Sequence, residues 1–287
     1  MSPWLFCRSI LCTPGLDPER FDKGFKAGAD AVLLDLEDSV PPESKALARR
    51  NVTRFLSKRE DPRLWGVRVN RLSSHDGLHD VMALLESDAR PDLLMFTKVE
   101  SPYEMEMVHN LFTERGIDID CSAVVETARG MANVAAIAQS PRVKMLIFGA
   151  ADFSLDLSIK FSWRSLEQAR FQMVLASAVA NVVAADSPYF KIGDLEGLER
   201  ECGESRGMGF TCKIALHPSQ VAAINSAFSP SPRSVEEAER IIEANRLSGD
   251  GCTMVDGHMI GPPFVKMAER VLQVHRNQKP AATLTVS

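Results

Sequence analysis

The sequence predicts a (β/α)8 TIM barrel, in which eight parallel strands alternate with helices, followed by a C-terminal helical extension. Three observations predict this fold. Short apolar runs recur at a spacing of about 30 residues, the usual size of one βα unit. The stretches between the runs have a helical pattern. Eight such units follow one another along the chain, which is the number that closes a barrel.

The expected strands are short and apolar, and polar or glycine-containing residues follow each of them. Helices are expected between them at residues 42–56, 101–115 and 164–180. The first two have proline at their first or second residue, which suits a first helical turn. In chain order the expected strands are residues 9–14, 31–37, 65–70, 93–99, 119–126, 144–149, 181–186 and 212–217.

Two domains are expected. Residues 1–228 form the TIM-barrel catalytic domain, and residues 229–287 form an extension that packs on the barrel or on a neighbouring subunit. The segment 228–233 (FSPSPR) is typical of a linker, residues 235–247 are expected as a helix, and residues 249–257 as a glycine-rich hairpin or loop.

The composition limits which binding partners and which cellular compartment are expected for this protein. Thirty-three Lys and Arg stand against 38 Asp and Glu, a net charge of -5, so no electrostatic reason exists to expect nucleic acid as a partner. The six cysteines include no CxxC pair and are expected to be reduced thiols. No segment approaches the roughly 20 apolar residues that span a membrane, and the first eight residues lack a secretory leader pattern. A cytoplasmic protein is therefore expected.

Charged residues at the strand ends point to an active site. Glu126 and Asp152 close two successive expected strands, so they are expected side by side on the rim of the barrel where TIM-barrel active sites lie. Two adjacent carboxylates repel unless a cation bridges them, and Mg²⁺ takes one or two carboxylates together with water and substrate oxygens. Alternatively, both are solvated loop acids, and Asp152 caps a loop at residues 153–158.

Arg68 lies in the segment 66–70 (GVRVN), where strict alternation points Arg68 and Asn70 toward the barrel mouth. A guanidinium there can hold a carboxylate or stabilise an enolate oxygen. A structural ion pair with Glu37 or Asp38 is the alternative, and the two roles are compatible.

The segment 34–39 (LDLEDS) carries three acids, and alternation places Asp35 and Glu37 on one face. At least one of them is expected to be functional or paired. Lys98, which follows an apolar run, is expected to neutralise these acids or to contact an acidic substrate, with an exposed surface position as the alternative.

Other familiar motifs are missing from the sequence. His75 and His79 have the spacing of a metal-binding pair, but no HExxH motif is present and solvated helix histidines are expected; His217 is expected to be catalytic or to lock its loop. GxGxxG, GxxxxGK[ST] and GxSxG are absent, so nucleotide cofactors and serine hydrolysis lack their usual sequence support.

Six motifs in order give the chain a resemblance that runs nearly end to end. It is similar to the citrate lyase β-subunit-like proteins of the HpcH/HpaI aldolase group, which includes malyl-CoA and citramalyl-CoA lyases. The motifs are residues 8–15 (RSILCTPG), 35–42 (DLEDSVPP, with Lys45 and Arg49), 67–70 (VRVN), 125–127 (VET), 148–152 (FGAAD) and 216–220 (LHPSQ).

The resemblance implies a Mg²⁺-dependent carbon–carbon lyase or aldolase. It implies as substrate a short hydroxyacyl-CoA, such as malyl-, citramalyl- or citryl-CoA, or a related hydroxy acid, and as product a keto acid such as oxaloacetate, pyruvate or glyoxylate. By position in the motifs, Arg68 resembles the catalytic, substrate-binding arginine, Glu126 and Asp152 resemble the metal ligands, with Glu126 also contacting substrate, and Glu37 and Asp38 resemble the supporting acids. The resemblance also implies a homotrimer in which the segment 255–263 covers a neighbour's site.

One position departs from the family pattern. Members with lyase or thioesterase activity typically carry an aspartate in a Met-Ile-Asp-x-Pro motif, and this chain has Gly261 there. The aspartate is the proposed proton-transfer group, and such steps contribute ~10²–10⁴-fold in rate. One alternative is an acyl-CoA thioesterase. The other, which the loss of the aspartate at Gly261 suggests, is a non-catalytic subunit that binds a keto acid and Mg²⁺.

Overall fold

The computed structural model describes residues 2–248 and 252–278. The chain separates into two compact units, Met1–Asn225 and Ser226–Ser287, and each is described by itself. The expected domain assignment, and the packing of the extension on its own barrel or on a neighbour, stay predictions.

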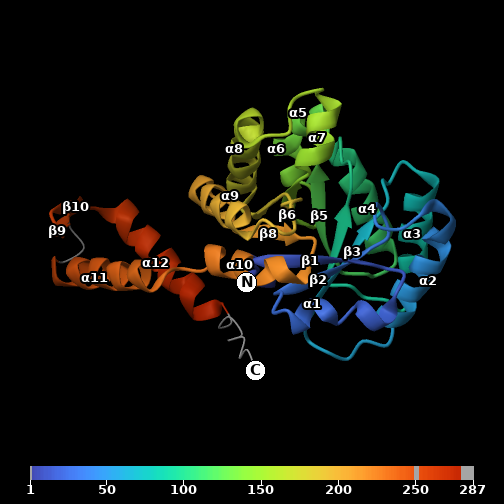
Figure 1. Cartoon of the computed structure of the whole chain (residues 1–287), viewed down its shortest axis with the longest axis horizontal. Helices are drawn as coiled ribbons and strands as arrows, with labels where there is room; N and C mark the ends of the chain where they lie inside the picture. The colour runs from blue at the N-terminus through green and yellow to red at the C-terminus, as the bar shows by residue number, and fades with distance from the viewer. Residues whose placement is uncertain (1, 249–251, 279–287) are drawn as a thin grey trace. The chain divides into compact units, whose positions relative to one another are not determined.

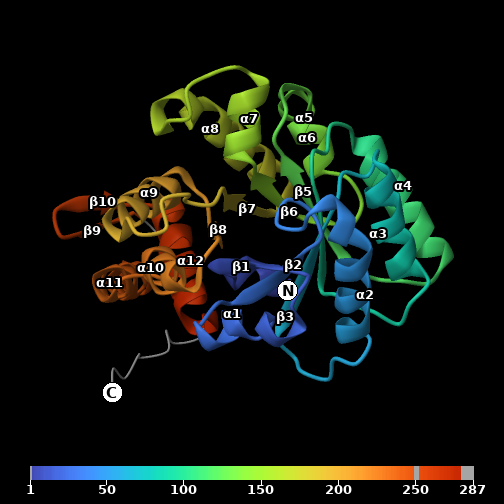
Figure 2. The same ribbon diagram turned by 45° about the vertical axis from the view of Figure 1, so that its right-hand side comes forward.

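The first unit is a closed parallel barrel in the order β1 to β8 (Figures 1 and 2). The TIM-barrel prediction is thus confirmed, and all eight expected strands are present. The strands are β1 (Ser9–Pro14), β2 (Ala31–Asp35), β3 (Leu64–Val69), β4 (Leu93–Phe96), β5 (Asp120–Val125), β6 (Val143–Phe148), β7 (Val183–Asp186) and β8 (Cys212–Ala215).

Several strands end earlier than expected, just before the polar residues that the sequence placed at their ends. The hydrogen bonds between neighbouring strands stop where polar side chains begin to bond the backbone of the following loops. Asp35, the last residue of β2, accepts hydrogen bonds from the backbone N–H groups of Glu37 and Ser39, at 2.9 and 3.0 Å. Glu126 lies one residue beyond β5, directly before Thr127, the N-cap of the next helix.

Helices surround the strands of this unit (Figure 2). The expected helices are found as a 3-10 turn followed by α2, as α4 and as α8, and the hydroxyl groups of Ser101 and Ser162 cap the last two by accepting backbone N–H groups. The α-helices are α1 (Lys23–Lys26), α2 (Lys45–Leu56), α3 (His75–Leu85), α4 (Pro102–Glu114), α5 (Ala128–Ala132), α6 (Val134–Ala138), α7 (Ala150–Asp156), α8 (Trp163–Ala180), α9 (Leu195–Met208) and α10 (Pro218–Phe228); the short 3-10 helices are η1 (Pro3–Phe6), η2 (Pro18–Arg20) and η3 (Pro42–Ser44).

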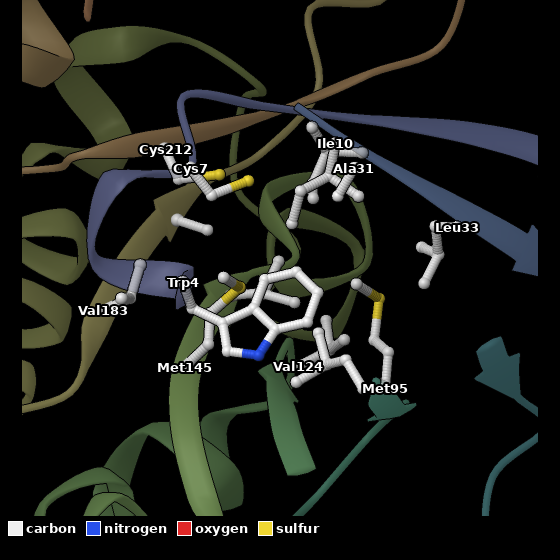
Figure 3. Close-up of a cluster of buried hydrophobic side chains, with 14 residues drawn as sticks. Trp4, Cys7, Ile10, Ala31, Leu33, Met95, Val124, Met145, Val183 and Cys212 are labelled. Atoms are coloured by element: carbon white, nitrogen blue, oxygen red, sulfur yellow. The ribbon is translucent and has the colours of Figure 1, made fainter. Parts of the chain in front are cut away.

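The interior of the barrel is a packed apolar core. Alternate residues of the strands point inward, as the period of two requires. Trp4, from η1, lies among Met95, Val124 and Met145 in Figure 3 and is 1% exposed. Its indole N–H donates to Asp120 at 3.2 Å, which satisfies the one polar group of the ring. The barrel is therefore closed by side chains and is not a pore.

A buried ionic cluster joins β7 and β8 to the helices outside them. Asp186 and Lys213 are in-register partners on these strands, and both are fully buried. Lys213 Nζ lies 2.7 Å from Asp186, and Arg170 of α8 donates to the same carboxylate at 2.9 Å. Burial favours the neutral form of Asp186, but Lys213 and Arg170 outweigh it and hold the pKa of that carboxyl below its ordinary value.

The second unit contains α11 (Pro232–Ser248), the strands β9 (Thr253–Val255) and β10 (His258–Ile260), and α12 (Pro262–Asn277). The strands form an antiparallel hairpin. The expected helix at residues 235–247 and the expected hairpin are both found, although residues 249–251 of the predicted loop lie outside the described residues. The expected linker is shorter than predicted, because α11 begins at Pro232.

None of the helices in the described ranges is long and apolar enough to cross a membrane.

Candidate active site

A cavity of about 440 Å³ opens at the carboxyl ends of the barrel strands. This is the rim where active sites of this fold lie. The inward side chains of the barrel core, such as Leu33, Met95 and Val124, form part of its wall. The other lining residues fall into two groups. The charged or polar ones are Cys12, Asp35, Asp38, Ser39, Arg68, Glu126 and Asp152. The remaining ones are Pro14, Ile147, Phe148, Gly149, Ala150, Ala151, Pro188, Phe190, Ile214 and Leu216.

Arg68 and Asp35 form a two-pronged ion pair beside this cavity. They are in-register partners on β3 and β2. Arg68 donates from Nε and from Nη2 to the two carboxylate oxygens of Asp35, both at 2.7 Å. Burial alone would raise the pKa of Asp35, which is fully buried, but the Arg68 guanidinium and the hydrogen bonds from Ser39 and Glu37 lower it. Asp35 is thus a fixed anion that orients the guanidinium.

Two further acids lie near the Nη1 atom of Arg68. Arg68 Nη1 lies 3.2 Å from Glu37 and 3.7 Å from Asp38. Burial raises the pKa of Glu37, while Arg68 opposes that rise. Sequence reasoning named Glu37 and Asp38 as the ion-pair partners of Arg68, and the structure adds Asp35 as the closest one.

Glu126 is a buried carboxylate at the end of β5, with 6% exposure. Its Oε1 accepts the backbone N–H of Lys98 at 2.8 Å. Burial raises the pKa of Glu126 to about 8; Lys98 acts against this rise, and the nearby acids Glu37 and Asp152 add to it. A cation beside Glu126 would stabilise its charged form.

Asp152 lies in the first turn of α7 and lines the same cavity. The alternative in which Asp152 caps a loop at residues 153–158 is wrong, because α7 continues to Asp156. Asp152 Oδ1 lies 3.6 Å from Lys98 Nζ, and its side chain is 38% exposed. A carboxylate at this position faces both the cavity and solvent.

The lack of a side chain at Gly149 leaves room for the side chain of Glu126. A Cβ atom at this position would lie 2.4 Å from both Cβ and Oε2 of Glu126, distances that real side chains do not adopt. The glycine between β6 and α7 is therefore required by the carboxylate of the neighbouring strand. The spacing of residues in the sequence contains no signal for this contact.

The donor set fits a hard divalent cation. Glu126 and Asp152 both line the cavity, and both interact with Lys98, through its backbone N–H and its ammonium respectively. Over residues 2–248 and 252–278, no group of three or more His, Cys, Asp or Glu side chains could hold a metal ion. Mg²⁺ needs only one or two carboxylates, because water and substrate oxygens complete its octahedron, whereas structural Zn²⁺ needs four protein ligands.

The remaining candidates lie elsewhere. His75 and His79 are exposed on α3, with their Nε2 atoms 3.0 Å apart. His217 Nδ1 contacts the Ser219 hydroxyl at 2.8 Å, which supports the loop-locking alternative. Asn70 does not line the cavity: its side chain bonds Asp80 and the carbonyl oxygen of Leu36.

The sequence motifs include Lys45 but do not predict its function in the loop. Its Nζ donates to the carbonyl oxygens of Leu36 and Glu37, at 2.8 and 2.6 Å, and to Asn70 Oδ1 at 2.8 Å. These three bonds hold the loop that carries Glu37 and Asp38. Its position at the start of α2 was the only available signal.

Comparison with known proteins identifies the family. The model of the HpcH/HpaI aldolase/citrate lyase family matches residues 8–218. The chain belongs to this family. A (3S)-malyl-CoA thioesterase of Cereibacter sphaeroides is 34% identical over 272 residues, which are 92% of this chain and 93% of that protein. Human mitochondrial citramalyl-CoA lyase is 32% identical over 286 residues, covering 92% of this chain and 84% of the human protein.

Among solved structures, the protein CitE from Mycobacterium tuberculosis in complex with magnesium, acetoacetate and coenzyme A has a TM-score of 0.82. It shares 29% sequence identity, and the match covers 94% of this chain and 98% of CitE. The expected membership of this family of aldolases and lyases is confirmed, and the chain is an enzyme of the HpcH/HpaI aldolase/citrate lyase family by descent. The matched relatives act on different CoA thioesters and by different reactions.

Proposed function

We propose that this protein is a Mg²⁺-dependent carbon–carbon lyase or aldolase that acts on a short hydroxyacyl-CoA and releases a keto acid. The observation that carries the proposal is that Arg68, Glu126 and Asp152 line one cavity at the carboxyl end of the barrel. Family membership supports the reaction class, and the magnesium in the CitE complex supports the cation.

Glu126 and Asp152 are the proposed metal ligands. Mg²⁺, when bound, supplies a Lewis acid that polarises the carbonyl of a chelating keto acid. Glu126 is held in place by the Lys98 N–H and by the close approach that Gly149 permits. Its burial places the carboxylate in surroundings of low polarity, where a charge opposite to its own is bound most strongly.

Arg68 is the proposed substrate-binding and catalytic residue. Two of its five N–H donors bond Asp35, so the guanidinium is fixed in one plane beside the cavity. Its Nη1 also lies 3.2 Å from Glu37. The donors beyond these contacts stabilise a carboxylate or the negative charge that develops on a substrate oxygen during carbon–carbon cleavage. Asp35, Glu37 and Asp38 position the guanidinium, and they do not need to touch the substrate.

The assay that tests the proposal separates cleavage from hydrolysis. Purified protein is incubated with Mg²⁺ and malyl-, citramalyl- or citryl-CoA, and the products are identified by mass spectrometry. Cleavage of the carbon chain that EDTA abolishes is the expected result. Intact substrates throughout would overturn the lyase proposal for this panel, whereas free CoA with an intact carbon skeleton would support a thioesterase.

Two other candidates remain: Gly261 favours a binding protein that lacks the usual proton-transfer acid, and the relatives favour a thioesterase. The 34% identical relative named as a thioesterase is consistent with hydrolysis. Gly261 is the N-cap of α12, and among the described residues a Cβ there would meet Cys252 Sγ at 3.6 Å and Pro263 Cδ at 3.9 Å, both ordinary contact distances. An aspartate is therefore sterically tolerated at this position.

Gly261→Asp tests whether the missing acid limits cleavage. A lyase that lacks its acid should gain turnover, by as much as ~10²-fold if the new carboxylate reaches the substrate. Gly203→Asp is the matched control, because Gly203 is exposed on α9 with nothing near its Cβ. No gain over this control on any of the CoA esters would favour the binding role.

We also propose a homotrimer in which the segment 255–263 of one subunit covers the site of the next, in a cytoplasmic protein. The motif resemblance supports this assembly. Light scattering after size-exclusion chromatography measures the subunit number, and a monomer at assay concentration would contradict it. Mixing a Glu126→Gln variant with a variant that lacks residues 229–287 tests the sharing of sites, because activity should recover only if subunits exchange extensions.

A further inference from the structure

Lys98 has an unusual backbone conformation at the centre of the site. Its φ angle is 52°, in the left-handed region, where a side chain with a Cβ atom costs roughly 1–2 kcal/mol. Lys98 comes two residues after the end of β4, and its N–H points toward Glu126, to which it donates at 2.8 Å. Strained backbone of this kind persists where the surrounding structure requires it.

The side chain of Lys98 points to the other acids of the site. Its Nζ lies 3.5 Å from Glu37 and 3.6 Å from Asp152. Both distances exceed the 2.7 Å of the bonds between Arg68 and Asp35. The ammonium is therefore shared between two carboxylates and is not tightly bound to either of them. One residue thus contacts both proposed metal ligands, Glu126 through the backbone and Asp152 through the side chain.

The acids of the site outnumber its cations. Four acids, Asp35, Glu37, Glu126 and Asp152, face the two cations Arg68 and Lys98. When all six groups are ionised, the difference is two negative charges, which one divalent cation cancels. Asp38 adds a further acid, but its side chain is 66% exposed and solvent screens it.

We propose that Lys98 is a built-in counter-ion that competes with the divalent cation for Asp152 and sets how weakly the site binds that cation. The inference rests on the metal site of the proposed function. In the metal-free protein the ammonium reduces the repulsion between Asp152 and Glu37. When a cation binds, the ammonium leaves Asp152 and keeps Glu37 as its partner, while its N–H continues to hold Glu126. Lys98 is therefore a positioning residue.

Metal affinity measured without substrate tests this role. Binding of Mn²⁺ is followed by electron paramagnetic resonance and binding of Mg²⁺ by calorimetry, on full-length protein. Lys98→Met should bind both cations about tenfold more tightly, the effect of one unit charge on a divalent ion roughly 6 Å away in a water-like medium. Lys98→Gln is the second neutral variant, in case Lys98→Met does not fold. Lys98→Arg keeps the charge and should stay within about twofold of the wild type.

Two further variants separate the counter-ion role from a purely structural role of the lysine. Lys58→Met removes the same charge from an exposed position after α2, and it should leave the affinity unchanged. Glu37→Gln removes the acid that receives the ammonium, so it should weaken binding by about tenfold. A lysine that only maintained the structure would weaken binding when it was replaced, in the same direction as Glu37→Gln.

The outcomes distinguish this inference from the proposed function. Tighter binding in Lys98→Met or Lys98→Gln, with wild-type affinity in Lys98→Arg and Lys58→Met, supports the counter-ion role. Equal or weaker binding in the neutral variants, with a wild type that binds Mn²⁺, overturns this inference alone. A wild type that binds neither cation overturns the metal site itself, and the counter-ion role with it.

Discussion

Replacing Asp35 by asparagine is the most informative single change, because it removes a charge from the centre of the arginine site and keeps the shape of the side chain. Asp35 accepts five hydrogen bonds: two from Arg68, one from the Glu37 N–H, and two from the N–H and hydroxyl groups of Ser39. Its Oδ2 receives three of them, from Arg68 Nη2 and from Ser39. In the asparagine variant, an NH₂ group at the position of Oδ2 would face the donors of Arg68 and Ser39 and could not accept their hydrogen bonds.

The magnitude follows from the bonds that are lost. The Ser39 hydroxyl can turn and accept, but the Ser39 N–H and Arg68 Nη2 lose their acceptor. An unsatisfied buried donor costs about 1–3 kcal/mol, and more when it is charged. Breaking a buried ion pair on one side costs about 3–5 kcal/mol. We therefore expect Asp35→Asn to lower the free energy of unfolding by about 4 kcal/mol at neutral pH, a large part of the stability of most proteins.

The pH dependence gives this prediction its sign. The pKa of Asp35 is lowered in the folded protein, because Arg68 and Ser39 outweigh the effect of burial, from an ordinary value of 3.8. A lowered folded-state pKa adds stability that is fully present above the unfolded-state pKa and is lost as the pH falls through the folded-state pKa. The gap between wild type and variant should therefore be constant above about pH 5 and should shrink below about pH 4.

Urea unfolding followed by circular dichroism, with EDTA present, measures this gap at several pH values. Asp38→Asn is the matched control: its carboxylate is 3.7 Å from Arg68 and 66% exposed, so its loss should change stability by less than about 0.5 kcal/mol. A loss below about 1 kcal/mol for Asp35→Asn, or a gap that is equal at pH 3 and pH 7, would refute the charge-based reasoning.

Three further predictions concern the metal site and the ionic cluster. Mg²⁺ at 100 times its Kd should raise the free energy of unfolding by about 2.7 kcal/mol, and Glu126→Gln should abolish the corresponding thermal shift; an undiminished shift would exclude Glu126 as a ligand. Gly149→Ala should displace Glu126 and abolish metal-dependent turnover, at a cost of about 1–3 kcal/mol in stability, whereas Gly203→Ala, with open space around it, should leave activity unchanged; full activity of Gly149→Ala would contradict the contact. Asp186→Asn should lower the free energy of unfolding in urea by about 3–5 kcal/mol. This difference between wild type and variant should disappear in acid, because the pKa of Asp186 is lowered in the folded state. A difference that acid does not change would contradict the ionic explanation.

Much of the barrel and part of the site could be predicted from the sequence. Strands such as 9–14 and 144–149 were predicted within one residue, because apolar runs of this length between polar stretches are a local signal. Glu126 and Asp152 were predicted together, because the carboxyl ends of parallel strands meet on one face of the barrel. The start of α7 at Ala150 was not predicted, since the segment after Gly149 has no strong cap or period.

The choice of partner for each charge was decided only by the tertiary structure. Asp35 pairs with Arg68, and Asp186 with Lys213, because β2 and β3, and β7 and β8, align in these registers. A shift of register by one residue would turn each of these side chains to the other face of the sheet, and the residue types along a strand do not fix which shift is adopted.

The sequence by itself determined the eight strands, their order and the rim on which the acids gather, because strand period and polarity are properties of consecutive residues. The expected pairing of Lys98 with an acid of the segment 34–39 is confirmed at Glu37. The folded chain decided that Lys98 also joins Glu126 and Asp152, and that Gly149 must lack a side chain. These contacts connect residues that lie up to 61 positions apart. Such distances between atoms are set by the twist and closure of the barrel, which no local pattern records.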